Sequence, residues 1–259
     1  MKLSIHEPHS YLADFIQYYW VLEQTLDTPA SSLNRVIPSG ELQIMFHYGA
    51  PFREVSQTKQ GILQPQCLIC GQQTGYMDIV PSGSVGMIAA VFYPHTFRAF
   101  FPDPVNEFTN QSVALDNFFR RETSELQERI IEAQRVPDRI CLIENFLLRR
   151  LSLPYHFDIT RAAINTIVKA QGQITIDETA KQLHISRRQF ERLFLTNVGM
   201  PPKQFGRIIR LHNTINLFRA DGSLTELSQA GGYFDQSHLI REFKEFTGLS
   251  PKAFFRHPC

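Results

Sequence analysis

The sequence predicts an α+β protein with two domains, in which a β-rich domain over residues 1–155 precedes an all-α domain over residues 156–259. The 259 residues exceed the length of one average domain. Strand-like runs fill the first hundred residues, and helical patterns follow from about residue 116. Between the two parts, Pro154 interrupts a helical pattern within the segment 152–157, because proline breaks a helix interior.

Three β-prone runs characterise the N-terminal part, at residues 41–48, 66–70 and 85–93. Pro and Gly separate them, at residues 38–40, 49–51 and 81–83. Short strands at this spacing predict a sandwich or barrel, here described as cupin-like and carrying additional helices. The aromatic-rich segment 11–23 fits either a helix or a strand.

Two amphipathic helices are predicted at the end of the β-rich domain. Segment 122–134 brings Leu126 and Ile130 to one face, and segment 137–151 does the same with Ile143 and Leu147. These helices also allow a second reading, in which the N-terminal domain is a dimerisation scaffold that senses nothing.

A repeat dominates the last hundred residues, because segment 185–205 recurs at 234–254, which is 234 − 185 = 49 positions later. Identical pairs are Arg192/Arg241, Phe194/Phe243, Gly199/Gly248, Pro202/Pro251, Lys203/Lys252 and Phe205/Phe254. Each copy has an N-cap, Ser186 or Asp235, an apolar stripe and a closing glycine. Shorter helices at 176–184 and 224–230 precede the copies, with Thr175 and Ser223 as caps. The pattern predicts two helix-turn-helix units.

A long helix is predicted between the units, at residues 201–220. Twenty residues at about 1.5 Å each span roughly 30 Å, close to the roughly 34 Å between successive major-groove segments of DNA. One chain is therefore expected to fill two consecutive segments of the groove.

The face of each second helix that lies opposite its apolar stripe is polar. Arginine there can hydrogen-bond guanine in the major groove. The alternative is a helix face that contacts only solvent and has no binding role. The candidate DNA-contacting residues are Arg187, Arg188, Glu191, Arg192, Gln236, Ser237, His238 and Arg241. The candidate phosphate contacts are Thr175, Ser186, Lys203 and Lys252.

Charge separates the two parts of the chain. Residues 158–259 contain 14 Lys and Arg against 9 Asp and Glu, or 14 − 9 = +5, and residues 1–157 contain 12 against 16, or 12 − 16 = −4. A basic C-terminal part permits a polyanionic partner without proving one.

A family resemblance rests on the segments 180–186, 235–238, 241–244 and 248–251, together with Gly232, Tyr233, Phe254 and Arg256. With these residues, positions 158–259 resemble the DNA-binding domain of the AraC/XylS family of bacterial transcription regulators. The resemblance implies a cytoplasmic regulator or activator that binds double-stranded promoter DNA and RNA polymerase. Ser228, Glu191 and Ile240 depart from the family pattern, which leaves base assignments open at Glu191 and Ile240.

The N-terminal part resembles an uncharacterised β-rich domain that precedes this DNA-binding domain in some relatives. The matching segments are 37–46, 92–95 and 106–116. This resemblance implies a sensing or partner-binding role, so a small-molecule effector and a homodimer are expected alternatives. Neither the effector nor the sign of regulation follows from it.

Enzyme, metal and membrane functions find little support in the sequence. Cys67 and Cys70 have the spacing of a zinc or redox pair, but residues three apart on a strand point to opposite faces. His47 and His95, with Tyr48 and Tyr93, fit a core or surface role better than a metal site. No catalytic motif and no apolar run of roughly 20 residues is present. We expect no cofactor and no enzyme activity, and keep a metal-binding or enzymatic β domain as the rival hypothesis.

Overall fold

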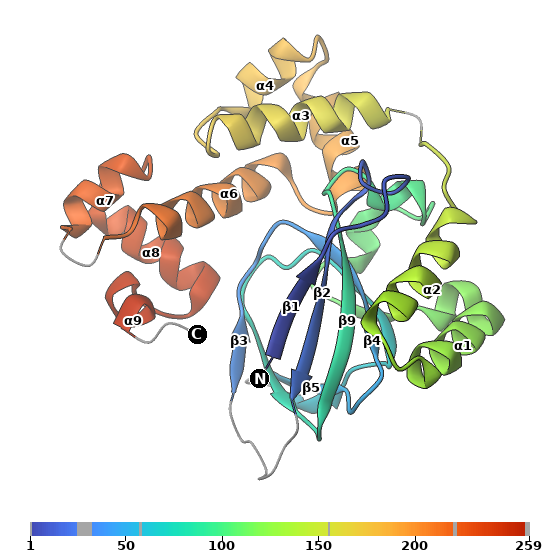
Figure 1. The fold of residues 1–259 in the computed structure, drawn as a ribbon. Coiled ribbons are helices and arrows are strands. Elements are labelled where there is room, and N and C mark those ends of the chain that lie inside the picture. The colour runs from blue at the N-terminus through green and yellow to red at the C-terminus, as the bar shows by residue number, and fades with distance from the viewer. Residues whose placement is uncertain (1, 25–32, 57–58, 155, 220–221, 257–259) are drawn as a thin grey trace.

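The computed structural model describes residues 2–24, 33–56, 59–154, 156–219 and 222–256, and shows a β-rich part beside a group of helices (Figure 1). The α+β organisation predicted from the sequence is confirmed. The predicted domain boundary at residue 155 lies outside the described residues.

The larger sheet has six antiparallel strands in the order β1-β2-β9-β4-β7-β10. Their bounds are Lys2–His6, Ile16–Gln24, Val85–Phe92, Leu42–His47, Cys67–Cys70 and Ser112–Ala114. Segment 11–23, which the sequence left ambiguous, forms a short turn followed by strand β2. An irregularity between Ile16 and Tyr18 lets both Ile16 and Tyr19 reach the core.

The smaller sheet has four antiparallel strands in the order β3-β8-β5-β6. Their bounds are Asn34–Val36, Met77–Pro81, Phe52–Ser56 and Lys59–Leu63. Among the described residues the two sheets do not join into a closed barrel. Of the two predicted architectures the sandwich is therefore the one observed, and the cupin-like description gains no support.

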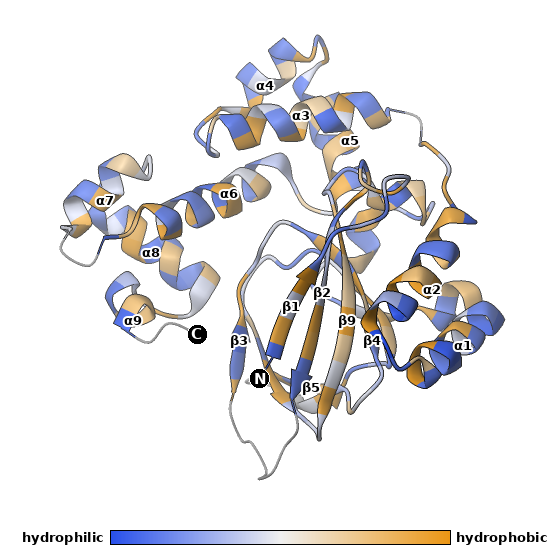
Figure 2. Cartoon of the chain, viewed as in Figure 1, coloured by the Kyte–Doolittle hydropathy of each residue, from blue (hydrophilic) through white to orange (hydrophobic). Residues whose placement is uncertain are grey.

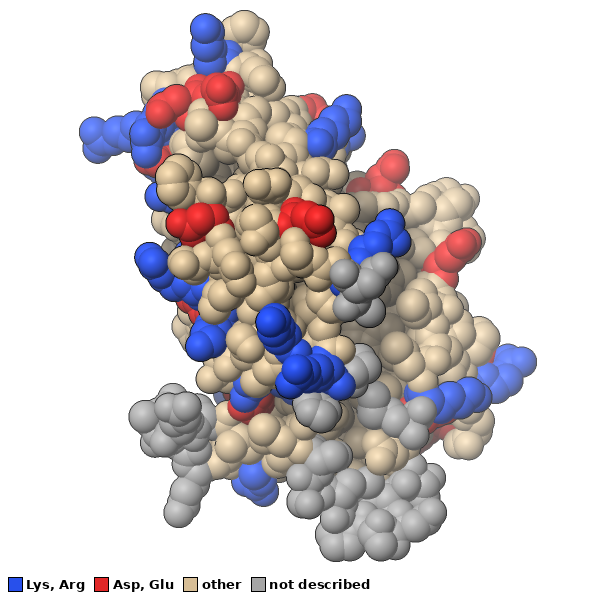
Figure 3. Space-filling view, turned by 90° about the vertical axis from the view of Figure 1, so that its left-hand side faces the viewer, with Lys and Arg blue, Asp and Glu red and all other residues tan. Residues whose placement is uncertain are grey.

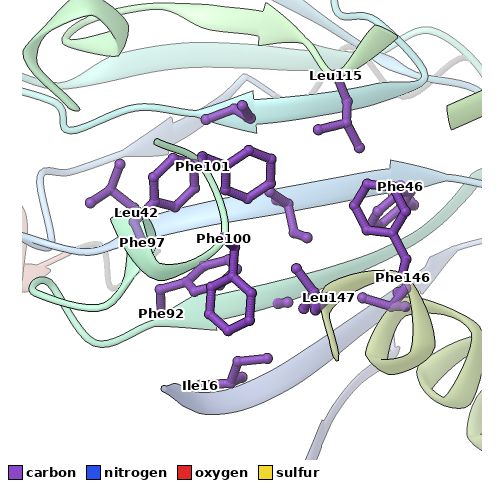
Figure 4. Packing of buried hydrophobic residues seen from close by; sticks show 14 of the residues in the cluster. Ile16, Leu42, Phe46, Phe92, Phe97, Phe100, Phe101, Leu115, Phe146 and Leu147 are labelled. Atoms are coloured by element: carbon purple, nitrogen blue, oxygen red, sulfur yellow. The ribbon is translucent and has the colours of Figure 1, made fainter. Parts of the chain in front are cut away.

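One face of the larger sheet packs against the smaller sheet, and its other face is covered by helices. This sheet is therefore buried on both sides. The covering elements are α1 (Asp116–Glu132), α2 (Val136–Leu148) and the 3-10 helices η1 (Phe97–Ala99) and η2 (Val105–Phe108). Figure 4 shows phenylalanines from β4, β9, η1 and α2 packed together in this core. Burial on both faces explains why every residue of β9 is buried and why its sequence is an unbroken apolar run.

The C-terminal part consists of helices. Their bounds are α3 (Phe157–Lys169), α4 (Ile176–Gln182), α5 (Arg187–Val198), α6 (Pro202–Leu217), α7 (Leu224–Ala230), α8 (Gln236–Thr247) and α9 (Pro251–Arg256). Figure 2 shows apolar and polar residues alternating along these helices, as amphipathic packing requires. The pairs α4–α5 and α7–α8 are the two helix-turn-helix units, and α6 joins them (Figure 1).

Helix α6 is shorter than the sequence predicted. Its 16 residues span about 24 Å, not the 30 Å expected of a helix over 201–220. The helix ends because Phe218 turns to an extended conformation and stacks on Phe255 of α9, with ring centroids 3.6 Å apart. The second unit therefore lies closer to the start of α6 than the prediction implied.

Candidate nucleic-acid interface

Helix α5 begins and ends as its sequence dictates. Ser186 accepts a hydrogen bond from the backbone N–H of Gln189, whose side chain in turn accepts from the backbone N–H of Ser186. At the other end Gly199 adopts a left-handed conformation with φ of 92°, which glycine accepts without steric cost. Phe190, Phe194 and Val198 are buried, so the opposite face is directed outward.

Helix α8 repeats this design with small differences. The carboxylate of Asp235 accepts from the backbone N–H of His238 at 2.7 Å, and Gly248 closes the helix with φ of 70°. Leu239, Phe243 and Phe246 are buried. The shorter helices α4 and α7 begin at Thr175 and Ser223, both in capping boxes, as their sequences predicted.

The outward face of α5 carries arginines in two different electrostatic states. Arg187 pairs with Glu191 at 3.0 Å on the same helix and with Asp177 of α4 at 3.2 Å. Arg188 and Arg192 are exposed, and the described part of the chain records no carboxylate partner for either. One arginine is therefore partly neutralised, and two are available to a polyanion.

The outward face of α8 presents fewer charges and more neutral donors. Gln236, Ser237 and Arg241 are exposed, and no ion pair is recorded for Arg241 within the described residues. His238 is half-buried against Tyr233, and its Nδ1 accepts from the backbone N–H of Phe234 at 3.4 Å.

A hollow of about 1020 Å³ lies between the two units along α6 and brings together some of the predicted contacts. Predicted residues in its wall are Thr175, Arg187, Lys203, His238 and Arg241. Arg192 instead borders a second hollow of about 600 Å³, which it shares with Arg98 and Arg150 of the β-rich part. Figure 3, which shows the left-hand side of Figure 1, shows Lys and Arg side chains spread over this face, with carboxylates among them.

The predicted phosphate contacts fall into two groups. Lys203 and Lys252 are exposed at the first turns of α6 and α9, where cations are free to reach a backbone. The hydroxyls of Thr175 and Ser186 are engaged in their own caps and donate to Glu178 and Gln189 at 2.7 and 2.8 Å. Either hydroxyl must leave that partner before it can donate to a phosphate.

One structural feature that sequence reasoning missed is the fixation of α8 on α6. Glu242, with a side chain only 3% exposed, pairs with Arg207 and Arg210 of α6, each at 2.8 Å. The signal was present, because Glu242 occupies the buried stripe of Leu239, Phe243 and Phe246 at the i+3 position. Two arginines of the basic C-terminal part are therefore already paired with a buried carboxylate, although both line the hollow along α6.

A second missed residue is Phe234, which is 93% exposed immediately before the N-cap of α8. It is the most exposed of the large apolar side chains in the described part of the chain. A phenylalanine at the tip of a recognition helix can contact a thymine methyl group in the major groove. The sequence signal was an aromatic residue in the turn, where polar residues are usual.

The cysteines and histidines that suggested the rival hypothesis are buried in the β-rich part. Burial raises the pKa of the Cys67 and Cys70 thiols to about 12, and the two lie on opposite faces of β7. Burial lowers the pKa of His47 and of His95 to about 4. No group of three metal-ligating side chains occurs among the described residues, and none of their helices is long and apolar enough to cross a membrane.

Comparisons with known proteins give one family match in each part of the chain. Residues 4–114 match a family model described as a domain of unknown function, DUF6597, and residues 179–257 match a model described as a helix-turn-helix domain. The chain is 26% identical over 98 residues to the HTH-type transcriptional regulator ArgR of Pseudomonas aeruginosa, which is 38% of this chain and 30% of that protein. It is 27% identical over 101 residues to the lactose operon transcription activator of Staphylococcus xylosus, which is 39% of this chain and 36% of that protein.

These two matches each span about a third of the relative's length. Among solved structures, ToxT from Vibrio cholerae is 10% identical with a TM-score of 0.49, over 92% of this chain and 97% of that one. The sequence matches, and not this structural likeness, confirm the resemblance of the C-terminal part that the sequence indicated.

Proposed function

We propose that this chain, which carries an AraC-type helix-turn-helix domain behind a DUF6597 domain, is a sequence-specific DNA-binding transcription regulator. The observation that carries the proposal is the pair of capped helices α5 and α8, each of which directs exposed arginine outward. Helix-turn-helix proteins read the major groove with the second helix of the unit, and this chain carries two such helices.

Within this proposal the exposed residues have distinct roles. Arg188, Arg192 and Arg241 hydrogen-bond base edges, with guanine the preferred partner of arginine. Gln236, Ser237 and His238 supply neutral donors and acceptors, and Glu191 orients Arg187 or accepts from a cytosine amino group. Lys203 and Lys252 hold phosphates, as do Thr175 and Ser186 once their caps release a hydroxyl.

The rest of the proposal concerns the whole protein. It acts in the cytoplasm without enzyme activity, and the DUF6597 domain receives a small molecule or a partner, which can be a second copy of the chain. The names of the relatives support regulation, one of them being an operon activator. Activation requires contact with RNA polymerase, which is therefore the proposed protein partner.

Selection of binding sites from a random duplex pool tests the proposal, followed by affinity measurements on the full chain. We expect the selected duplex to bind more tightly than a scrambled one, and affinity to fall as salt rises. Arg192→Ala and Arg241→Ala should each cost about 1–3 kcal/mol of binding free energy. The control is Arg121→Ala on α1, whose side chain is 92% exposed and distant in the chain from the units.

Two results contradict the proposal. One is a selected pool with no common sequence. The other is an affinity that the double variant Arg192→Ala, Arg241→Ala leaves at the level of the Arg121→Ala control.

A further inference from the structure

A partly open cavity of about 120 Å³ lies between the two sheets of the β-rich part. Its wall is mainly apolar, and six of its residues are Trp20, Met45, Phe52, Met77, Ile79 and Met87. Close-packed interiors rarely leave a void much larger than one water molecule. Apolar cavities of roughly 150 Å³ bind benzene, so this volume suits a molecule of about one ring.

On the larger sheet, the cavity lies where a small side chain stands between two large ones. Trp20 and Met45 are both paired with Ala89 across neighbouring strands, so a methyl group lies between two large side chains on one face of the sheet. Three of the five methionines in the chain also line the cavity. Methionine is flexible and polarisable, and it makes favourable contacts with aromatic rings. The wall therefore favours an apolar ring over a sugar or a multiply charged molecule.

The cavity wall also carries polar side chains, namely Ser39, Glu41, Gln43, Gln64 and Gln73. The indole N–H of Trp20 donates to the Gln43 side-chain oxygen at 3.0 Å. The carboxyl group of Glu41 accepts long hydrogen bonds from Gln17 at 3.3 Å and from Tyr18 at 3.4 Å, and the Ser39 hydroxyl also hydrogen-bonds to it. Burial raises the pKa of Glu41. This carboxyl group retains the capacity to accept a shorter hydrogen bond from a hydroxyl or amino group of a ligand.

The cavity wall is continuous with the contact between the β-rich part and α6. Segments 36–41 and 70–77 line the cavity, and other residues of the same two segments contact α6. The His212 Nε2 of α6 donates to the Pro38 carbonyl at 2.7 Å, and the Gln204 amide of α6 donates to the Thr74 carbonyl at 3.3 Å. The two segments are tied together by Gln72, which donates to the Gly40 carbonyl at 2.9 Å.

We propose that this cavity binds a small, mainly apolar ring compound with a hydroxyl or amino group directed at Glu41, and that its occupancy moves α6 through segments 36–41 and 70–77. The binding step follows from the cavity alone. The consequence for DNA rests on the proposed function, because α6 joins the two recognition units.

Fluorescence tests the binding step, because Trp20 is the only tryptophan of the chain and lines the cavity. The full chain is titrated with phenol and, separately, with benzene. We expect a saturable change in tryptophan emission with both probes and a severalfold tighter response to phenol. Glu41→Leu should bring the phenol response down to that of benzene. A wild-type protein without a saturable response to either probe overturns the proposal.

A matched pair of variants tests the location. Cys70→Met places a longer apolar side chain into the cavity and should abolish the response, whereas Cys141→Met makes the same exchange at the exposed cysteine of α2 and should preserve it. Ser39→Met fills the cavity from the opposite wall if Cys70→Met fails to fold. A folded cavity-filling variant that responds like the wild type overturns the assignment.

Hydrogen exchange on the full chain tests the coupling. Saturating phenol should slow or accelerate amide exchange severalfold in segments 36–41 and 70–77 and in α6. A change confined to the β-rich part contradicts the coupling. A saturable phenol response in a protein that binds no selected duplex refutes the proposed function and leaves the cavity as a binding site.

Discussion

Helices α5 and α8 lie in the two copies of one sequence repeat, yet they are held in place differently. Helix α5 contacts the β-rich part, where Arg98 donates to Asn197 at 3.0 Å and Thr109 donates to the Gly199 carbonyl at 2.5 Å. Helix α8 also accepts a hydrogen bond from the β-rich part, from Arg35 of β3 to the Thr247 carbonyl at 3.1 Å, and it is held on α6 by the buried pairs of Glu242 with Arg207 and Arg210. Both units therefore contact the β-rich part, and α8 has in addition a buried ionic contact with α6.

The outward faces of α5 and α8 also differ. On α5, Arg187 is already paired with Glu191 and Asp177, whereas α8 presents Arg241 without a recorded carboxylate and Phe234 without apolar cover. The two copies therefore share the framework of caps and apolar stripe, while the side chains on their outward faces differ.

The largest effect is expected when the internal fixation of α8 is removed. Glu242→Ala leaves two arginines half-buried without their carboxylate, and breaking such a pair costs about 3–5 kcal/mol of the free energy of unfolding. Urea unfolding followed by far-ultraviolet circular dichroism measures the loss. Glu245→Ala, which removes a half-exposed partner of Arg207, should cost less than about 1 kcal/mol. Equal losses in the two variants would mean that the burial of Glu242 contributes nothing.

Acid should loosen α5 before α8. The pKa of His47 and of His95 is lowered to about 4 by burial, so both are neutral in the fold and take up a proton on unfolding. The folded state therefore keeps its full stability above the ordinary histidine pKa near 6.5. As pH falls toward 4, each histidine lowers the free energy of unfolding by on the order of 2 kcal/mol. Trp20 emission follows the β-rich part, and hydrogen exchange at pH 5 compares the helices. If exchange accelerates in α8 first, the pairs of Glu242 with Arg207 and Arg210 do not give α8 the additional stability expected of them.

The arginines of α5 should differ in their value for DNA binding. Arg188→Ala should cost about 1–3 kcal/mol of binding free energy, because this side chain is free to contact DNA. Arg187→Ala should cost less, since Arg187 must first leave Asp177 and Glu191. Titration of both variants with the selected duplex measures the difference. A larger loss for Arg187→Ala would show that the carboxylates orient this arginine toward a base.

The smallest effect is expected at Phe234. Because this side chain is 93% exposed, Phe234→Ala should change the free energy of unfolding by no more than about 0.5 kcal/mol. It should weaken binding modestly, and replacement of thymine by deoxyuridine in the selected duplex should weaken the wild type by a similar amount, because the methyl contact is lost. If deoxyuridine weakens the Phe234→Ala variant as much as it weakens the wild type, the aromatic ring does not read a thymine methyl group.

What could be predicted from the sequence was local. Caps such as Ser186 and Asp235 and the glycines at 199 and 248 act within one turn of helix, so α5 and α8 were placed within one or two residues. Strand β8 was missed because all five of its residues are half-buried and show no alternation. The contact of His212 with Pro38 joins residues 174 positions apart, which no pattern within a segment encodes.

The predicted site was limited in the same way. Exposure of Arg188, Arg192 and Arg241 followed from helical periodicity, because the opposite positions are apolar. The pairing of Arg187 with Asp177 depends on how α4 packs on α5, and the position of Arg192 beside Arg98 depends on how the β-rich part packs on α5. Both depend on how separate elements pack together, which a pattern within one segment does not encode.

The central claim is that α6 holds two recognition helices at a fixed separation on one DNA duplex. Affinity for the selected duplex should therefore be measured before and after insertion of about 5 base pairs, half a helical turn, between its two half-sites. The insertion should reduce affinity to that of a duplex with one half-site, and Arg241→Ala should then cost nothing further on the inserted duplex. An affinity unchanged by the insertion would contradict the account.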